Sequence, residues 1–112
     1  NDDTVIKHRH KGGRYAGYNN VQASFCNIFT GHTHVLTCSP ISTFDQKTYW
    51  GIQTGTLADI NAESFQYTED NAKDWRQGFI MASWEQGRLL MPEMVMVSGE
   101  NEVEFRGEIL KV

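Results

Sequence analysis

Short apolar runs separated by polar turns dominate the first third of the chain. β-branched residues at positions 4–6 predict a first strand over 4–7, and the apolar pair at 28–29 predicts another strand over 28–30. Between them lies a short helical pattern near residues 19–26, which Asn19 or Asn20 is suited to cap. Strand, loop, helix and strand in this order predict a βαβ-like unit. Such sheets carry their sites at the carboxyl ends of their strands.

The remaining pattern is mainly β. Residues 47–54 predict a strand, and the polar stretch 66–77 predicts a loop or a marginal helical turn. In segments 78–84 and 88–97, apolar residues occur among both the odd and the even positions, which point to opposite faces of a strand. This pattern predicts a hairpin of core strands buried on both faces. Apolar and charged residues alternate around 103–105, as in a half-exposed strand. The side chains expected to be mostly buried in the hairpin are Phe79, Met81, Leu90 and Met94.

Composition fits a single soluble domain spanning residues 1–112. The hydrophobic fraction is 39% and the charged fraction 21%, and no apolar run approaches the roughly 20 residues that cross a bilayer. Two cysteines do not make a disulfide framework, so we expect a reducing, cytoplasmic compartment. No leader-like segment opens the sequence, which begins with Asn1 rather than Met, as in a processed product or a piece of a longer chain.

Charge is unevenly distributed along the chain. Of 10 basic and 14 acidic residues, four basic residues lie in the segment 7–14, which contains no acid. The other residues therefore carry six basic against 14 acidic side chains, a net charge of −8. A basic loop in an acidic chain predicts an anionic ligand, with phosphate the first candidate, although a solvated loop folded onto the acidic remainder gives the same pattern. Lys11 and Arg14 are candidates for contacting the phosphate.

Three histidines are predicted to meet at one edge of the sheet. His8 follows the first strand, and His32 and His34 follow the second in the run Gly31-His32-Thr33-His34. Parallel pairing of these strands would bring His8 close to His32. Imidazole is the commonest protein ligand for metal ions near neutral pH, and Gly31 offers backbone freedom for a close approach.

A rival interpretation assigns two of these histidines to a single zinc site. Cys26, His32, His34 and Cys38 are ligand types that suit a structural zinc ion. Their spacing lacks the tight C-x₂₋₄-C knuckles of such sites. Alternatively, Cys26 is a small buried apolar residue at the end of the predicted helix.

The residues above resemble a known family. The run 5–34 is similar to the last metal-binding segment of the calcineurin-like metallophosphoesterases. In that segment a strand ending in His is followed by a Gly-containing loop, a helix, a second strand and Gly-His-x-His. Gly55-Thr56-Leu57-Ala58-Asp59-Ile60-Asn61 and Asp74-Trp75-Arg76-Gln77-Gly78-Phe79 resemble the phage and bacterial branch of that family. The resemblance covers nearly the whole chain.

The resemblance implies a pair of divalent metals that hydrolyses phosphate esters. His8 and His32 would bind one metal and His34 the other, with Mn²⁺ most expected and Zn²⁺, Fe or Mg²⁺ as alternatives. The family usually has Gly after its first histidine, whereas Arg9 and a further histidine stand here, so His10 is an alternative to His8. Val35 occupies a position that often holds Arg in the phage branch.

The earlier motifs of the family, Asp-x-His, Gly-Asp-x-x-Asp and Gly-Asn-His, do not occur in the sequence. The resemblance therefore implies the C-terminal half of a metallophosphoesterase domain: a β-rich α/β half of a double-sheet α/β/β/α sandwich with mixed strands. Such a half would be inactive alone and would need the N-terminal half or a second copy of the chain. The alternatives are a non-catalytic module that binds nucleic acid, nucleotide or phosphate, and a structural zinc protein. The family branch implies a bacterial or phage-infected cell.

Overall fold

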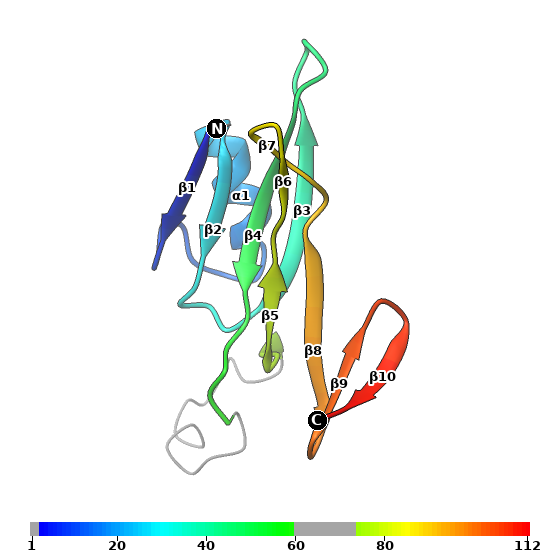
Figure 1. Ribbon diagram of the computed structural model, residues 1–112. Coiled ribbons are helices and arrows are strands. Elements are labelled where there is room, and N and C mark those ends of the chain that lie inside the picture. The colour runs from blue at the N-terminus through cyan, green and yellow to red at the C-terminus, as the bar shows by residue number, and fades with distance from the viewer. Residues whose placement is uncertain (1–2, 60–73) are drawn as a thin grey trace.

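Parallel pairing of the first two strands organises the amino-terminal part of the molecule. A computed structural model describes residues 3–59 and 74–112 (Figure 1); most of the stretch 66–77, expected as a loop or helical turn, lies outside them. Strand β1 (Thr4–Lys7), helix α1 (Ala16–Ser24) and strand β2 (Asn27–Thr30) follow one another, and β1 pairs with β2 in parallel. The βαβ-like unit predicted from the sequence is confirmed.

Two further strands complete this sheet in the order β1-β2-β4-β3. Strand β4 (Thr48–Thr54) runs parallel to β2, and β3 (Leu36–Ser42) pairs with β4 antiparallel. Pro40 lies within β3. Because proline has no N–H to donate, it fits a strand at the edge of a sheet, and β3 occupies that place. The sequence patterns had not predicted β3.

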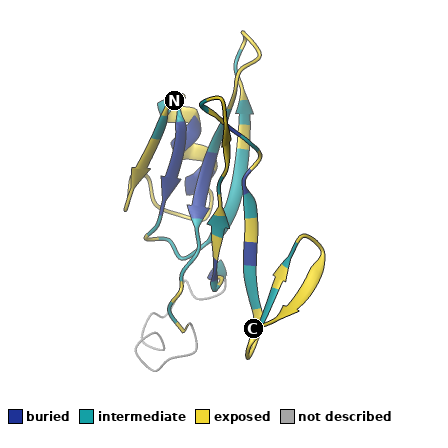
Figure 2. Cartoon of the chain, in the orientation of Figure 1, coloured by how far each residue is buried: buried dark blue, intermediate teal, exposed yellow. Residues whose placement is uncertain are grey.

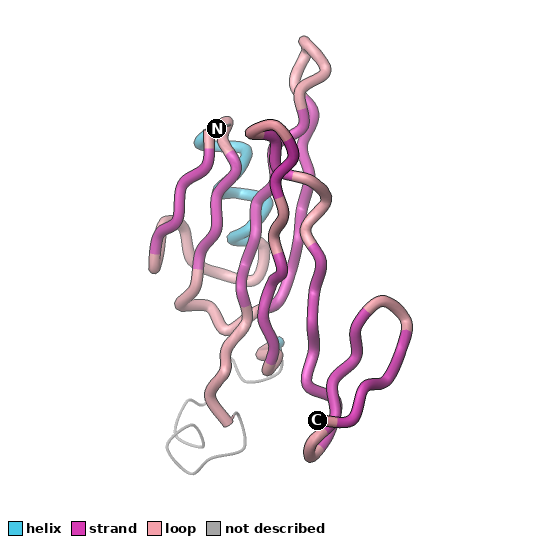
Figure 3. The backbone as a smooth tube through the Cα atoms, viewed as in Figure 1, coloured by secondary structure: helices cyan, strands magenta, loops and turns pink. Residues whose placement is uncertain are grey.

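The carboxyl-terminal part consists of strands joined by turns (Figure 3), and these strands pair antiparallel. One sheet has the order β10-β9-β8-β5, and β6 and β7 form a separate hairpin. The six strands are β5 (Gly78–Met81), β6 (Trp84–Glu85), β7 (Arg88–Leu89), β8 (Glu93–Gly99), β9 (Glu102–Phe105) and β10 (Glu108–Lys111). The hairpin predicted for the segments 78–84 and 88–97 and the strand around 103–105 are therefore confirmed as strands.

Buried residues concentrate on β2, β4 and α1 of the amino-terminal part (Figure 2). On one face of the first sheet, Phe29, Ile52 and Leu89 form the core between the sheet and the β6–β7 layer. On the other face, α1 covers the sheet and buries Ala16 and Val21 completely. The fold is therefore a β-rich α/β arrangement with mixed and antiparallel sheets. In the part of the chain that is described, no helix is both long and apolar enough to cross a membrane.

The helix begins earlier than the sequence predicts, at Ala16 rather than near residue 19. Tyr15 stands at its N-cap and makes no capping hydrogen bond with its side chain. The capping role expected of Asn19 or Asn20 is therefore wrong. Asn20 is fully buried within the helix, where its Oδ1 accepts the backbone N–H of Lys11 at 2.8 Å and its Nδ2 donates to the Thr30 hydroxyl at 3.4 Å. Because the Asn20 side chain makes these tertiary hydrogen bonds, it does not cap the helix.

The burial predicted for the hairpin is wrong, although its strands are present. Phe79, Met81 and Met94 are 42%, 43% and 49% exposed, and Leu90 is only half-buried. Apolar residues at both odd and even positions are buried on both faces of a sheet only where another layer covers each face. Among the described residues of the hairpin, Leu89 and Val95 are buried, and Ile80 and Ala82 pack against the core of Phe29, Ile52 and Leu89. Much of the apolar surface of this sheet is left exposed.

The closest approach of α1 to the sheet generates a stability prediction. A Cβ atom added at Gly51 would lie 1.9 Å from the carbonyl oxygen of Gly17, so Gly51→Ala must push the helix off β4. We expect the free energy of unfolding to fall by about 3 kcal/mol, at the upper end of typical overpacking effects. Urea denaturation followed by circular dichroism measures it.

The matched control is Gly99→Ala, where the nearest atom to an added Cβ is the Glu102 carboxylate oxygen at 3.5 Å. That substitution should leave stability nearly unchanged. Equal effects of the two substitutions would show that the helix does not pack as closely on β4 as described.

Candidate functional site

Two histidines meet where the parallel strands β1 and β2 end. Nε2 of His8 and Nδ1 of His32 are 3.2 Å apart, and the two rings pack edge to face with centroids 5.1 Å apart. The parallel register of β1 and β2 places the residues after Lys7 and Thr30 at the same edge of the sheet. The sequence predicted this approach of His8 to His32, and the structure contains it. Metal binding by the pair stays a prediction.

The Gly31-His32-Thr33-His34 segment is a turn with unusual backbone angles. His32 has φ of +69° and His34 has φ of +58°, both in the left-handed region. Each such residue stores strain on the order of 1–3 kcal/mol, which the surroundings must offset. Gly31 has no positive φ, and an added Cβ would lie 3.8 Å from its nearest neighbour. The expectation that Gly31 supplies the backbone freedom is therefore wrong, because the two histidines adopt the strained angles themselves.

Gln53 on β4 holds this turn in place. Its side chain is buried, and its Oε1 accepts a hydrogen bond from the Thr33 hydroxyl at 2.6 Å. Its Nε2 donates to the Thr37 hydroxyl at 2.9 Å and to the backbone carbonyl of Arg14 at 3.4 Å. One amide therefore connects the histidine turn, the edge strand β3 and the loop that leads into α1.

His34 occupies a more enclosed position than His32. Its ring packs edge to face on the Trp75 indole with centroids 4.4 Å apart, and its backbone carbonyl accepts the N–H of Arg76 at 2.9 Å. Burial lowers the pKa of His34, and the nearby charges of His32 and His8 lower it further. A lowered pKa favours the neutral imidazole, which is the form that binds metal ions.

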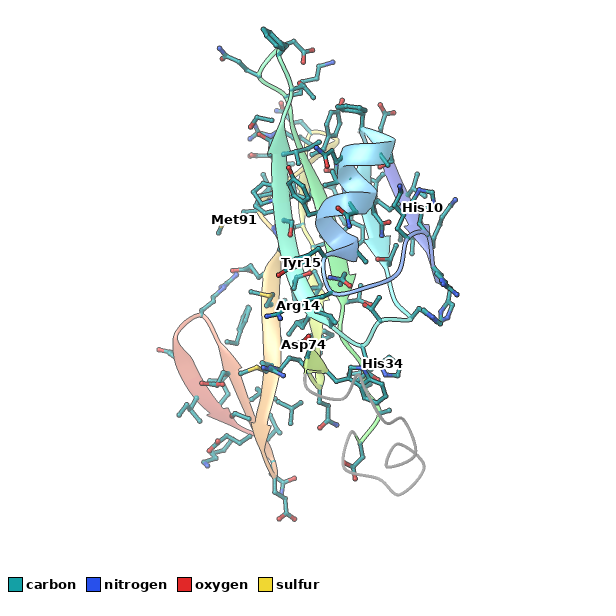
Figure 4. The ribbon with its side chains drawn as sticks, turned by 180° about the vertical axis from the view of Figure 1, so that it is seen from behind. His10, Arg14, Tyr15, His34, Asp74 and Met91 are labelled. Carbon is teal, nitrogen blue, oxygen red and sulfur yellow. The ribbon has the colours of Figure 1, made fainter. Side chains whose placement is uncertain are left out.

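A cavity of about 340 Å³ opens beside His32. Arg14 forms part of its wall, and its Nε lies 3.7 Å from an Oδ2 of Asp74 (Figure 4). Lys11, the other residue expected to contact phosphate, is not part of that wall, whereas Arg9 is. The lining residues are Arg9, Gly12, Gly13, Arg14, His32, Thr33, Val35, Asp74 and Trp75.

Sequence reasoning missed the roles of Arg9 and Asp74 in this cavity. The sequence marked Arg9 only as a departure from the family pattern. Its positive charge, as part of the basic loop 7–14, is the feature that could have indicated a place in the cavity wall. Asp74 stood out only as the first residue of the family-like run 74–79. The structure brings its carboxylate to Arg14, 60 positions earlier in the sequence, and no local pattern encodes that contact.

The distance between His8 and His32 fits one metal ion. Two nitrogens each about 2.0–2.1 Å from a tetrahedral ion lie about 3.3 Å apart, close to the 3.2 Å seen here. His10 is exposed and lies well away from His34 (Figure 4). Across residues 3–59 and 74–112, however, no three His, Cys, Asp or Glu side chains are grouped closely enough to form a metal site by themselves.

The arrangement of the cysteines does not favour the zinc alternative. Cys38 lies in the middle of β3 and packs against the apolar cluster of Phe29, Ile52 and Leu89. Burial raises the pKa of its thiol to about 11. A thiolate, which is the form that binds zinc, is therefore disfavoured there.

Comparison of the chain with protein-family models, with curated proteins and with solved structures finds no match.

The histidine pair generates a metal-binding prediction. We expect His8→Ala and His32→Ala each to weaken Mn²⁺ or Zn²⁺ binding at least about 10-fold, because loss of a group that merely orients a metal ligand already has an effect of that size. Isothermal titration calorimetry measures the affinities.

His10→Ala is the control, and it should leave the affinity unchanged. A loss of binding in His10→Ala with none in His8→Ala would move the ligand to His10. If none of the three substitutions changes the affinity, no metal binds at this edge of the sheet.

Gln53 generates a second prediction for the site. Gln53→Met keeps the size of the side chain but leaves the Thr33 and Thr37 hydroxyls without their amide partner. We expect the unfolding free energy to fall by about 2 kcal/mol, since a buried polar group without a partner costs about 1–3 kcal/mol. Metal affinity should fall with it, because the histidine turn loses its anchor; chemical denaturation and calorimetry measure the two effects. Gln77→Met, which changes an exposed amide hydrogen bond to the Leu57 carbonyl, is the matched control.

Proposed function

We propose that this chain contributes part of a two-metal phosphoesterase centre of the calcineurin-like type, acting on a phosphomonoester or phosphodiester. The observation that carries the proposal is the convergence of His8 and His32 at the carboxyl edge of a parallel sheet, beside a cavity with arginines in its wall. The specific half of a double-sheet sandwich named by the sequence resemblance is part of the same proposal. The β-rich α/β fold and its βαβ-like unit support it.

In this proposal the histidines bind the metal ions and the basic residues bind the phosphate. His8 and His32 would hold one divalent metal and His34 the second. When bound, the pair supplies an activated water and neutralises the charge of the phosphoryl oxygens. Arg14 and Arg9 draw the phosphate into the cavity, with Lys11 adding to the positive potential of the loop. The ion pair with Asp74 orients Arg14 when no phosphate is present.

The ligand set of this chain fits half of such a centre. Three neutral imidazoles contribute no negative charge, and a bridging carboxylate is what holds two cations together. Since the sequence lacks the motifs that supply that carboxylate in the family, the proposal requires a partner. The partner is the missing N-terminal half of the domain or a second copy of this chain, within the cytoplasm of a bacterial or phage-infected cell.

One observation favours a second function, a non-catalytic module that binds nucleic acid, nucleotide or phosphate. Tyr15 and Tyr18 are 65% and 44% exposed beside the basic loop, and the guanidinium of Arg14 lies 5.7 Å from the centre of the Tyr15 ring. Exposed aromatic rings next to arginines form a surface on which nucleic-acid bases stack. This function predicts DNA affinity that falls steeply with salt and needs no metal.

Activity of the isolated chain tests the phosphoesterase proposal. We expect residues 1–112 to be nearly inert towards a nitrophenyl phosphodiester in Mn²⁺, because nothing in their motifs bridges the metals. Adding a polypeptide that carries the Asp-x-His, Gly-Asp-x-x-Asp and Gly-Asn-His motifs should produce turnover, and His34→Ala should abolish it. Release of nitrophenolate, followed by absorbance, is the measurement.

Two outcomes would contradict the proposal. Robust, chelator-sensitive hydrolysis by the chain alone would mean that carboxylates such as Asp59 or Asp74 complete the centre. Salt-sensitive DNA binding that a chelator leaves unchanged, with no turnover after the motifs are added, would favour the non-catalytic module.

A further inference from the structure

The turn between β3 and β4 presents a fully exposed aromatic side chain. Phe44 has a relative exposure of 110%, and its turn projects beyond the end of the first sheet (Figure 1). The turn is nonetheless well ordered by hydrogen bonds. The N–H of Thr43 donates to the Lys47 carbonyl at 2.9 Å, the N–H of Gln46 donates to the Thr43 carbonyl at 2.9 Å, and the Thr43 hydroxyl donates to the Asp45 carboxylate. A preorganised turn that exposes a phenylalanine has the character of an interaction hot spot.

A cavity of about 610 Å³ lies at the base of the same hairpin, and we name it the end cavity. Asn27 and Thr48, the first residues of β2 and β4, form part of its wall. It is therefore at the opposite end of the sheet from His8 and His32, which follow the carboxyl ends of β1 and β2. Its apolar wall consists of Trp50, Leu89, Leu90 and Met91.

We propose that Phe44 of one copy of the chain inserts into the end cavity of a second copy, and the reverse, in a dimer with two-fold symmetry. A two-fold interface requires that one patch of surface carry both complementary parts. The projecting ring and the cavity meet that requirement, because residues 46–48 connect the turn directly to the cavity wall.

Charge complementarity favours a second copy as the occupant. Asp45 follows Phe44 on the turn, and Arg88 lies in the wall of the end cavity. Within the described segments, Arg88 makes no ion pair of its own, whereas Lys47 already pairs with Asp45 at 3.6 Å. Among the described residues of the wall, Arg88 is the cation without an ion pair, and Asp3 is the acid. A phenylalanine entering with an adjacent carboxylate therefore matches the wall in both shape and charge.

The area available fits a weak dimer. A buried phenylalanine removes about 200 Å² from water, and the wall that covers it loses a similar area, so the two contacts bury about 800 Å². Interfaces below about 1,200 Å² are at the low end and are typical of weak complexes. The dimer concerns a different surface from the proposed phosphoesterase centre, and neither proposal depends on the other.

Sedimentation equilibrium of the full chain over a range of concentrations tests the dimer. The wild-type chain should show a reversible monomer–dimer equilibrium, and Phe44→Ser should weaken it about 100-fold, because every dimer contains the contact twice. Met91→Glu, which places a charge in the wall of the end cavity, should weaken dimerisation as well. Met91 is 72% exposed, so the fold should tolerate that change. Phe25→Ser, at an exposed phenylalanine that follows α1, is the matched control and should leave the equilibrium unchanged.

Arg88→Glu tests the charge contact separately and should weaken the dimer about 10-fold at low salt, with a smaller effect at high salt. Circular dichroism of each variant establishes that it is folded. A wild-type chain that remains monomeric at every concentration would overturn the proposal. A dimer that survives both Phe44→Ser and Met91→Glu would also overturn it and would place the interface on another surface.

Discussion

A single buried amide fixes the relation between the parts of the candidate site. Among the described residues, Gln53 bonds to Thr33 in the histidine turn, to Thr37 on β3, which follows that turn, and to the carbonyl of Arg14. Since a buried amide that loses a partner is penalised by about 1–3 kcal/mol, separating these segments is unfavourable by about that amount. Strand β4, which carries Gln53, therefore links the histidine turn to the loop that carries Arg14. The strained angles of His32 and His34 are held by the same connection.

The parts of the fold that depend on local pattern were predictable. β-branched residues predicted β1, the apolar runs predicted β4, β5 and β8, and the order of elements predicted the parallel pairing that joins His8 to His32. The start of α1 was not predictable, because Asn20 bonds to Lys11 and Thr30 rather than capping the helix. Strand β3 was hidden by Pro40, which is tolerated only because the strand lies at an edge.

The site shows the same division between local and distant interactions. Residue type and order were enough to identify the three histidines as candidate metal ligands and the basic loop as a candidate phosphate-binding segment. Which members of that loop face the cavity depends on the path of the backbone between β1 and α1, so Arg9 and Arg14 line it while Lys11 does not. The positive φ angles of His32 and His34 could not be predicted either, because glycine is the residue that normally adopts them and Gly31 is adjacent.

The position of β1 has a consequence for how the site assembles. Within residues 3–59 and 74–112, this strand has a neighbour on one side only, and Ile6 within it is 78% exposed. Strands with few buried contacts open locally at much lower free energy than the core of a domain does. Opening of β1 alone would carry His8 away from His32 while the remaining strands of the sheet stay paired. A ligand that joins the two rings binds only the closed state, so its binding energy adds directly to the local stability of β1. Ligand affinity at this edge and the order of the first strand are thus two measures of one equilibrium.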